Sequence, residues 1–584
     1  MNIKIRQLPR LAAMSSALLL MAGHAVPGAT LEVVVRHSFN GAPLLLDSLR
    51  YRNAAGETLS VTRLSYLLSG FAVEREDGTW LEIPDQYAWM DAARGRTHAR
   101  LPGIPGANYR ALRFHIGPDP AGNAADPARF AADHPLNANL NGLHWGWQGG
   151  YIFLALEGRY ATDPTDLKGY AHHLARDPNR TRVSLAAPLD LTQDATAWLD
   201  FDLGTLGNAP RPVSFGRDGA ATHSRGGDPV AAALVANLPG SFRVMQVVST
   251  IPALSRPSPL KPIDLPETYT PYRFTMSGSF PLPDLPRDNP LIEERIALGK
   301  VLFHETSLSR DGMLSCASCH LETHAMADPR RYSIGVRGQT GTRNAMPLFN
   351  LAWKNSFFWD GRATSLRSQA LMPIQDHTEM DETLERVTTR LAATRDYPRL
   401  FTAAFGSSDI TAARLGLALE QYLLTLTSYQ SRFDRALKGE KILDEAERRG
   451  FELFMTEYDP RTGQRGADCF HCHGGPLFTD HRFHNNGLAP DDADPGRFRV
   501  TGNEADRHKF ASPSLRNVSR TAPYMHDGRF ATLEEVIAHY SGGVHRSPTL
   551  DPNLAKHPAG GLQLGIEDQR ALVAFLKTLA EDEP

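Results

Sequence analysis

The most specific chemistry in this sequence lies in two short cysteine-histidine motifs. The pattern C-x-x-C-H occurs twice and uses all four cysteines of the chain: Cys316, Cys319 and His320, then Cys469, Cys472 and His473. In this pattern the two thiols add to the vinyl groups of a heme and the histidine ligates its iron. A redox dithiol, a four-thiolate zinc site and two structural disulfides are the alternatives. Two complete motifs favour two covalently bound c-type hemes.

The residues opposite the motif histidines decide which kind of heme protein this is. A heme with two strong axial ligands transfers electrons, whereas a heme with an open face can bind peroxide and split its O–O bond. Near the second motif, the segment Pro523–Tyr540 offers four candidates, namely Met525, His526, His539 and Tyr540.

Residues 285–584 resemble the bacterial diheme cytochrome c peroxidase and MauG superfamily. The resemblance rests on four strings in family order: LGKVLFHETSLSRDGMLSCASCH, FFWDGRATSLRSQALMPIQ, FASPSLRNV and TAPYMHDGRF. In ordinary members a methionine at the place of Tyr540 ligates the electron-entry heme. Members with tyrosine there resemble MauG and MbnH, which oxidise tryptophans in partner proteins. A phenolate is a hard donor that favours oxidised iron, so Tyr540 would let the second heme hold an oxidising equivalent. The alternative is a buried core tyrosine.

The same resemblance places Gln375 and Glu379 over the first heme. A glutamate there can move a proton between the two oxygens of hydrogen peroxide. Its alternative reading is a solvated carboxylate at a helix start. The loop at residues 333–343 lacks the histidine that closes this heme in many ordinary peroxidases, so we expect an open first heme.

Further site residues follow from the resemblance alone. It places Trp359 between the hemes as a bridge for a shared oxidising equivalent, with a core tryptophan as the alternative. It makes His526 a catalytic candidate. It also suggests a Ca²⁺ bound by Asn344 and the backbone oxygens of Thr521 and Pro523, since oxygen donors suit this ion.

The first half of the chain carries a W-x-W motif at Trp145 and Trp147. Alone, it would indicate two aromatic side chains on one face of a strand. Residues 31–250, however, resemble the MbnP-like copper-binding family through HSFNGAPL, SYLLSGFAVEREDG, YRALRFHIG and GYIFLALEG. The resemblance implies that Trp145 is converted to kynurenine, whose aryl amine then helps to bind Cu(I). Imidazoles suit copper, and His37 and His173 are the predicted ligands, with His172 as the rival of His173.

The elements that must position these residues change character along the chain. Short β-branched runs such as Leu31–Arg36, Ala111–Ile116, Tyr151–Leu156 and Phe242–Ser249 predict an all-β antiparallel sandwich or barrel-like domain over residues 30–250. A proline-rich linker follows at 251–285. Mainly α tandem cytochrome c-like heme domains are then predicted at 286–440 and 441–584. Their expected helices are Leu291–Phe303, Thr383–Phe405, Thr411–Leu437, Asp444–Tyr458, Ile566–Leu579, and one starting at a capping box of Thr532 and Glu535.

The amino terminus and the charge balance bound the location and the partners. Residues 1–25 combine basic residues, an apolar run and a small-x-small site, which predicts a signal peptide; an uncleaved anchor is the alternative. No later apolar run is long enough for a membrane span, so we expect an exported, periplasmic protein. The net charge of −3 argues against a nucleic-acid partner.

These features together predict a natural fusion of a copper protein with its maturing enzyme. Hydrogen peroxide would be the oxidant, and the protein substrate would be the chain's own β domain or that of a neighbouring copy. Linking the two raises their effective concentration. An electron-donor protein is a further expected partner. Two other functions stay open: a peroxide-detoxifying cytochrome c peroxidase with an appended copper-binding domain, and a copper store or sensor whose hemes report redox state.

Overall fold

The computed structural model describes residues 28–581, except residues 146–148, 164–165, 223, 225, 250–263, 460–462 and 489–493. The predicted signal peptide at 1–25, much of the predicted linker and Trp147 therefore lie outside the described residues. Within the described part of the chain, no helix is both long and apolar enough to cross a lipid bilayer.

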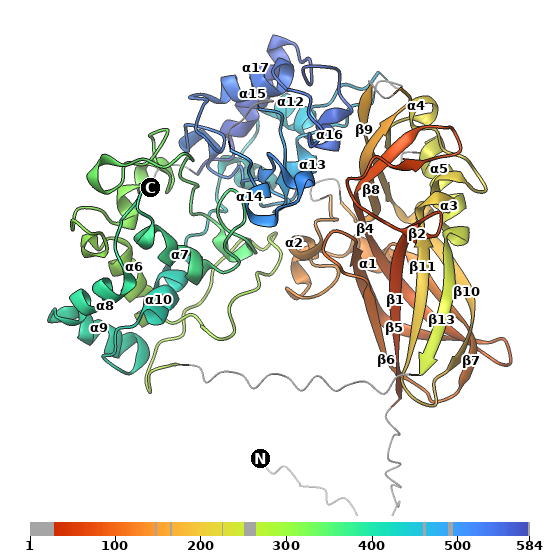
Figure 1. The fold of residues 1–584 in the computed structure, drawn as a ribbon, viewed down its shortest axis with the longest axis horizontal. Coiled ribbons are helices and arrows are strands. Elements are labelled where there is room, and N and C mark those ends of the chain that lie inside the picture. The colour runs from red at the N-terminus through yellow and green to blue at the C-terminus, as the bar shows by residue number, and fades with distance from the viewer. Residues whose placement is uncertain are drawn as a thin grey trace, which may run out of the picture.

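The first half is a sandwich of two sheets, which confirms the predicted fold class (Figure 1). One sheet has the order β13-β11-β1-β2, with β6 also paired to β1, and the other has the order β10-β7-β4-β8-β9-β12, with β3 and β5 also paired to β4. The bounds are β1 Ala29–Phe39, β2 Ala42–Pro43, β3 Tyr51–Arg52, β4 Thr58–Arg75, β5 Trp80–Asp91, β6 His98–Ile104, β7 Asn108–Ile116, β8 Ile152–Ala161, β9 Leu167–Ala175, β10 Thr181–Asp190, β11 Ala195–Asp202, β12 Ala221–Thr222 and β13 Phe242–Ser249.

Two strand pairs depart from the predicted antiparallel pattern. Strands β1 and β11 are parallel, as are β9 and β12. Parallel neighbours need a long crossover connection, and nearly all of the second sheet lies between β1 and β11 in sequence. No local signal in either strand reveals such a pairing.

The helical half covers the outer face of the second sheet at β8 and β9, whereas β10 alternates buried and exposed residues. All ten residues of β8 are buried, whereas an outer strand face exposed to water would alternate. The short helix α16 (Pro552–Ala555) lies against β9, where a Cβ atom at Gly169 would collide with the Pro552 carbonyl oxygen. Arg159 of β8 donates to the carbonyl oxygen of Ser547 at 3.1 Å and to those of Pro548 and Leu550. Glycine and arginine thus position the two halves against each other.

The second half is mainly helical, as predicted. Its longer helices are α6 Glu293–Phe303, α7 Leu366–Gln375, α8 Leu384–Ala392, α9 Asp396–Phe405, α10 Ala412–Leu424, α11 Arg432–Leu437, α12 Glu445–Phe454, α15 Leu533–Gly542 and α17 Ile566–Lys577. The capping box of Thr532 and Glu535 opens α15.

Two predicted helices are each divided in the structure. The segment 383–405 forms α8 and α9, and the segment 411–437 forms α10 and α11. Apolar periodicity continues through both breaks. At the second break, Ser431 and Asp434 form a capping box that starts α11 anew. Pro398 is the third residue of α9. Proline is tolerated in a helix only near its start, so α9 must begin just before this residue.

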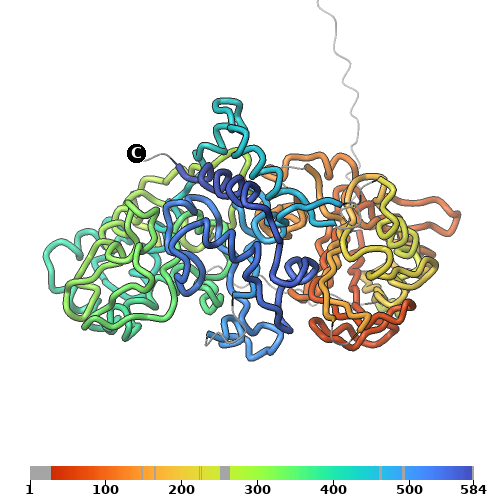
Figure 2. Tube along the Cα trace, turned by 90° about the horizontal axis from the view of Figure 1, so that it is seen from above, coloured from red at the N-terminus to blue at the C-terminus, as the bar shows by residue number. Residues whose placement is uncertain are grey.

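The buried apolar side chains show how the halves are joined. Those of residues 280–477 around the first motif form one cluster. Those around the second motif, residues 433–579, belong to the same cluster as the core of the β domain. Figure 2 shows the first heme region (green) and the β domain (red to yellow) at opposite ends, with the second heme region (blue) between them.

Candidate heme centres and the cavity at the domain boundary

The first motif presents a histidine prepared for metal ligation. Cys316 begins a short turn, and all four cysteines of the chain are free thiols in the described structure. The Nδ1 atom of His320 lies 2.9 Å from the carbonyl oxygen of Met326, to which it donates. This bond fixes the tautomer that leaves Nε2 as the ligand atom. Burial lowers the pKa of His320 and so favours the neutral imidazole that iron needs.

A cavity adjoins this motif. Cys316, Cys319 and His320 line it together with Glu379. Burial, and secondarily the neighbouring Asp376, raise the pKa of Glu379 to about 7, against an opposing effect of Arg362. A free carboxyl with both protonation states accessible near neutral pH can accept and return a proton.

The backbone around Glu379 is held by the preceding loop. Val336 donates its backbone N–H to the Glu379 carbonyl oxygen at 2.8 Å. Gly335 lies so close that a Cβ atom would collide with the Thr378 carbonyl oxygen. Gln375 lies elsewhere. It is the exposed last residue of α7, and its side-chain amide donates to the Leu371 carbonyl oxygen. Unlike Glu379, it does not line the cavity.

The second motif holds its histidine with the same kind of hydrogen bond. Its helix α13 (Phe470–His473) ends at His473, whose Nδ1 donates to the carbonyl oxygen of Phe478 at 3.2 Å. Burial lowers the pKa of His473 as well. Thiols on one side and an oriented neutral imidazole on the other are the donors that a covalent heme requires, so both motifs fit the group.

Tyr540 of α15 lies beside the second motif. Burial raises its pKa to about 12, and the neighbouring Cys472 and Cys469 add to the rise. Asn486 lies with its amide nitrogen 3.3 Å from the tyrosine hydroxyl, to which it donates. His539 is directed elsewhere, with Nε2 3.1 Å from the Asn486 carbonyl oxygen.

His484 also lies at the second motif and was missed by sequence reasoning. Its two ring nitrogens lie 2.8 Å from an Asp480 oxygen and 2.7 Å from an Asp551 oxygen. These carboxylates raise the pKa of His484 despite its burial. It stands in a loop rich in glycine and asparagine, where the sequence gives no periodic or motif signal.

A continuous strip of contacts runs between the two heme regions. Trp359 donates from Nε1 to the Asn344 carbonyl oxygen at 2.9 Å, and the Asn344 N–H donates to the His526 carbonyl oxygen at 2.7 Å. The His526 ring stacks on Phe510 with centroids 3.6 Å apart. The structure thus brings Trp359, Asn344 and His526 together.

The residues of the predicted calcium site make contacts of their own. The Asn344 side-chain amide donates to the carbonyl oxygens of Arg330 and Arg331, both at 3.2 Å. The Thr521 hydroxyl donates to the Val518 carbonyl oxygen at 3.2 Å, and Pro523 follows a cis peptide bond. Calcium binding by Asn344, Thr521 and Pro523 stays a prediction.

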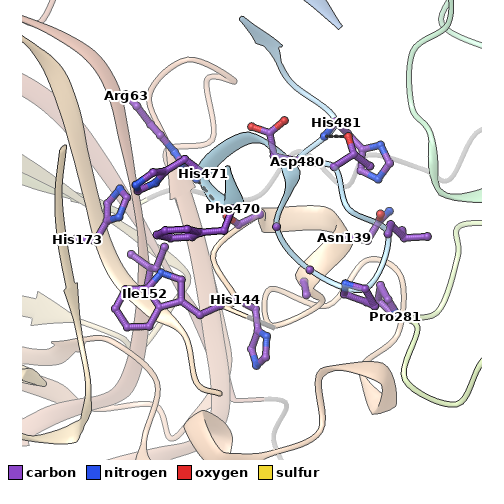
Figure 3. Close-up of a pocket in the computed structure, with 18 residues that line it drawn as sticks. Arg63, Asn139, His144, Ile152, His173, Pro281, Phe470, His471, Asp480 and His481 are labelled. Carbon is purple, nitrogen blue, oxygen red and sulfur yellow. Dashed lines mark hydrogen bonds between the residues drawn. The ribbon is translucent and has the colours of Figure 1, made fainter. Parts of the chain in front are cut away.

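A second cavity lies where the β domain meets the second motif (Figure 3). The β domain contributes Trp145 and His173 to its lining, and the heme half contributes Phe470 and His471. Phe470 and His471 are the two variable residues of the second C-x-x-C-H. Trp145, 8% exposed, therefore shares a cavity with the heme-attachment motif itself.

Two of the four histidines that line this cavity, His173 and His471, face each other across the domain boundary. The ring centroids of His173 and His471 lie 5.3 Å apart. His173 Nε2 contacts a Glu157 oxygen at 2.9 Å, and Arg63 pairs with the same carboxylate at 2.8 Å. His471 Nε2 contacts a Glu457 oxygen at 2.9 Å.

The predicted copper residues do not all meet. On the second sheet, Tyr66 pairs with Leu154, and His173 pairs with the next residue, Ala155, whose side chain points to the opposite face. His37 lies on the Tyr66 face, inside the sandwich, with Nε2 3.0 Å from the Tyr66 hydroxyl. The structure therefore separates His37 from Trp145 and His173, because adjacent strand residues point to opposite faces.

His172 also points away from Trp145. Its Nε2 contacts the Gly219 carbonyl oxygen at 3.1 Å, and its ring meets Phe215 at 4.9 Å between centroids. Of the two neighbouring histidines, only His173 lines the cavity.

Comparison with known proteins gives matches to both halves. Residues 293–442 match the family described as di-haem cytochrome c peroxidase, and residues 28–217 match the family described as MbnP. The methylamine utilization protein MauG of Methylorubrum extorquens is 40% identical over 297 residues, which cover 50% of this chain and 80% of that protein. The cytochrome c551 peroxidase of Nitrosomonas europaea is 34% identical, covering 53% and 86%. A solved structure of a MauG-like protein associated with microbial copper homeostasis is 35% identical, covering 53% and 96%, with a TM-score of 0.48.

Proposed function

Because the chain belongs to the di-haem cytochrome c peroxidase family, as a fusion with an MbnP domain, we propose that it oxidises its own β domain. In this proposal hydrogen peroxide is the oxidant, Trp145 becomes kynurenine, and the altered residue takes part in a Cu(I) site for copper homeostasis. The observation that carries the proposal is the cavity shared by Trp145 and the Phe470-His471 pair of the second heme motif.

The first centre supplies the acid–base chemistry. When bound, the two hemes supply peroxide reduction and hold the resulting oxidising equivalents. Glu379 in its carboxylate form takes the proton from the oxygen of hydrogen peroxide that enters the cavity. The protonated carboxyl then returns that proton to the departing oxygen, which leaves as water. A pKa of about 7 keeps both forms accessible at neutral pH.

The second centre supplies the contact with the substrate. Tyr540 is an anionic oxygen donor when it loses its proton, and such a donor favours oxidised iron. The strip of Trp359, Asn344 and His526 joins the two heme regions. Phe470 and His471 bring the second region against Trp145, so the oxidised partner and the substrate need no diffusional encounter.

The chemistry at Trp145 balances with peroxide as the oxidant. Two molecules of hydrogen peroxide remove four electrons from the indole, break its C2–C3 bond, add one oxygen atom to each carbon, and yield two molecules of water. Hydrolysis of the resulting formyl group releases formate and leaves an aryl amine and a ketone. The amine nitrogen is a donor that the intact indole lacks.

We further propose that the mature chain works in the periplasm, where covalent heme attachment and copper handling both suit an exported protein. The alternative function is removal of hydrogen peroxide with electrons from a donor protein. It would use the same first cavity and Glu379, but it gives no role to the placement of Trp145.

Peptide mass spectrometry across Trp145 tests the proposal. Protein carrying both hemes is treated with hydrogen peroxide, beside an untreated sample and a His473→Ala variant. We expect kynurenine at position 145 in the treated intact protein alone. Intact tryptophan in fully hemylated, peroxide-treated protein would overturn the proposal and favour the detoxifying peroxidase.

A further inference from the structure

Among the described residues, the two predicted copper ligands His37 and His173 lie on opposite sides of the second sheet. His37, the predicted partner of His173, lies inside the sandwich against Tyr66, while His173 and Trp145 line the outer cavity. We propose that His471, from the second heme motif, completes with His173 a Cu(I) site that spans the two domains beside residue 145. The inference rests on the proposed function only for the kynurenine nitrogen, not for the two imidazoles.

The orientation of the two rings supports this assignment. Their centroids lie 5.3 Å apart with an interplanar angle of 56°. Each ring uses Nε2 to contact a carboxylate, Glu157 for His173 and Glu457 for His471, both at 2.9 Å. In the tautomer that donates Nε2–H to the carboxylate, the lone pair of each ring is on Nδ1; Lys556 Nζ also lies 3.4 Å from Nε2 of His471. A ring N–H donated to a carboxylate is the usual outer support of a metal-bound histidine, and it also raises the basicity of the ligand.

Acidic and basic side chains surround the pair. Arg63 pairs with Glu157 at 2.8 Å, and Lys556 pairs with Glu457. Asp468 lies 3.1 Å from Lys556 and 3.7 Å from Nε2 of His471. Imidazoles and an aryl amine form a donor set that suits copper.

The other histidines near the cavity are less suitable. His144 lines the same cavity but points away from His173 and His471, and His481 lies on its far side near Asp480 (Figure 3). His172 faces the sandwich interior against Phe215. Among the residues that the structure describes, His471 is the one that brings a second imidazole to His173, and it comes from a different domain.

A site of this kind has a functional consequence. Copper bound between the two domains would stabilise their contact, since a ligand that requires both surfaces favours the associated state. The metal would also reach its site only after the heme half is in place. The enzyme half would then serve as part of the copper site after it has finished oxidising Trp145.

Competition for Cu(I) against a coloured chelator, in the purified full chain with both hemes attached, tests the inference. We expect His471→Gln to weaken Cu(I) binding by at least about 100-fold, since even the loss of an outer support costs about 10–100-fold. His481→Gln, at the far side of the same cavity, is the matched control and should leave the affinity within about twofold. His471→Met, which restores a soft donor, should recover part of the affinity.

The readouts separate this inference from the proposed function. Heme content and the mass of residue 145 are measured in every variant. Unchanged Cu(I) affinity in His471→Gln, with hemes and kynurenine present, would overturn the inference and leave the proposed function intact. Tryptophan at position 145 in the peroxide-treated intact protein would overturn the proposed function. The His471→Gln comparison would then still decide whether the two imidazoles bind copper.

Discussion

The two heme regions share a motif but differ in what surrounds it. In both, a backbone carbonyl oxygen accepts from Nδ1 of the motif histidine, at His320 and at His473. The first region has its own apolar core and a cavity lined by Glu379. The second shares its core with the β domain, and Tyr540 lies beside its cysteines.

The difference indicates a division of labour. Proton transfer near neutral pH needs a buried carboxyl with a pKa near 7. Glu379 in the first cavity has such a pKa, whereas the pKa of Asp480 in the second cavity is lowered, despite burial, to about 2 by the neighbouring His484. In the proposed function, the second motif contacts the protein substrate through its two variable residues, which line a cavity with Trp145. One repeated motif would then serve two roles because its neighbours differ.

Replacing Tyr540 with methionine should remove most of the functional difference between the two heme regions. A thioether favours reduced iron, so Tyr540→Met should turn the second centre into an electron relay. We expect no detectable kynurenine at residue 145 after peroxide treatment, measured by peptide mass spectrometry, while peroxide reduction with an added electron donor persists. Normal kynurenine formation in this variant would show that the tyrosine is only a core residue.

The acid–base role assigned to the first cavity is tested by Glu379→Gln. Loss of a positioned general acid–base group costs about 10²–10⁴-fold in rate, and we expect a fall of this size in peroxide consumption. Glu385→Gln, an exposed carboxylate at the start of α8, is the control. A change below about tenfold at Glu379 would contradict the assigned role.

The same carboxyl predicts a pH profile. With a pKa of about 7, Glu379 is mostly protonated below neutral pH and cannot accept the peroxide proton. The rate of the reaction with peroxide should therefore fall as the pH drops below about 7 and level off above it. Stopped-flow measurements from pH 5.5 to 8.5 should show this inflection in the wild type and lose it in Glu379→Gln.

The ion pairs under the second cavity should contribute to stability. Arg63 and His173 hold the pKa of Glu157 well below its usual value despite burial. This stabilisation is present above the unfolded-state pKa of about 4.5 and is lost as the pH falls through the lower folded-state pKa. Glu157→Gln leaves Arg63 buried without its partner, so we expect a loss of about 3–5 kcal/mol at pH 7. Calorimetry should show this difference shrinking toward pH 3; a constant difference would contradict the ionic origin.

The smallest effect is expected from weakening the contact between β8 and the loop before α16. Arg159 donates to three carbonyl oxygens of the loop before α16. Hydrogen bonds to a charged group contribute about 1.5–3 kcal/mol each, but the shared apolar core remains. We expect Arg159→Ala to slow kynurenine formation about tenfold, and Arg110→Ala, a surface pair with Glu74, to have no effect. Equal rates in both variants would show that this loop does not position the domains.

The sequence predicted the individual helices and strands better than the contacts between distant segments. Strong local signals worked: the capping box at Thr532 starts α15, and Phe242–Ser249 is a strand over the predicted range. Breaks without a change of periodicity, as between α8 and α9, were not predictable. The parallel pairing of β1 and β11 was missed because it depends on residues far apart in sequence.

The candidate site shows the same limit. Glu379 and Trp145 were expected from motifs, and both line cavities. His37 was grouped with His173, although the strand register places them on opposite sides of the sheet. His471 was overlooked because the variable positions of C-x-x-C-H carry no pattern of their own. Only the packing of β9 against α16 reveals what these positions face.

The central claim is that each chain oxidises its own Trp145 through the second heme motif that covers it. A His473→Ala chain grown with heavy nitrogen is mixed with an intact, unlabelled chain, treated with hydrogen peroxide, and digested for mass spectrometry of the peptide containing residue 145. The account predicts kynurenine in the unlabelled peptide alone, at a rate independent of dilution. Kynurenine in the heavy peptide at a comparable rate would show that oxidation occurs between chains and would contradict the account.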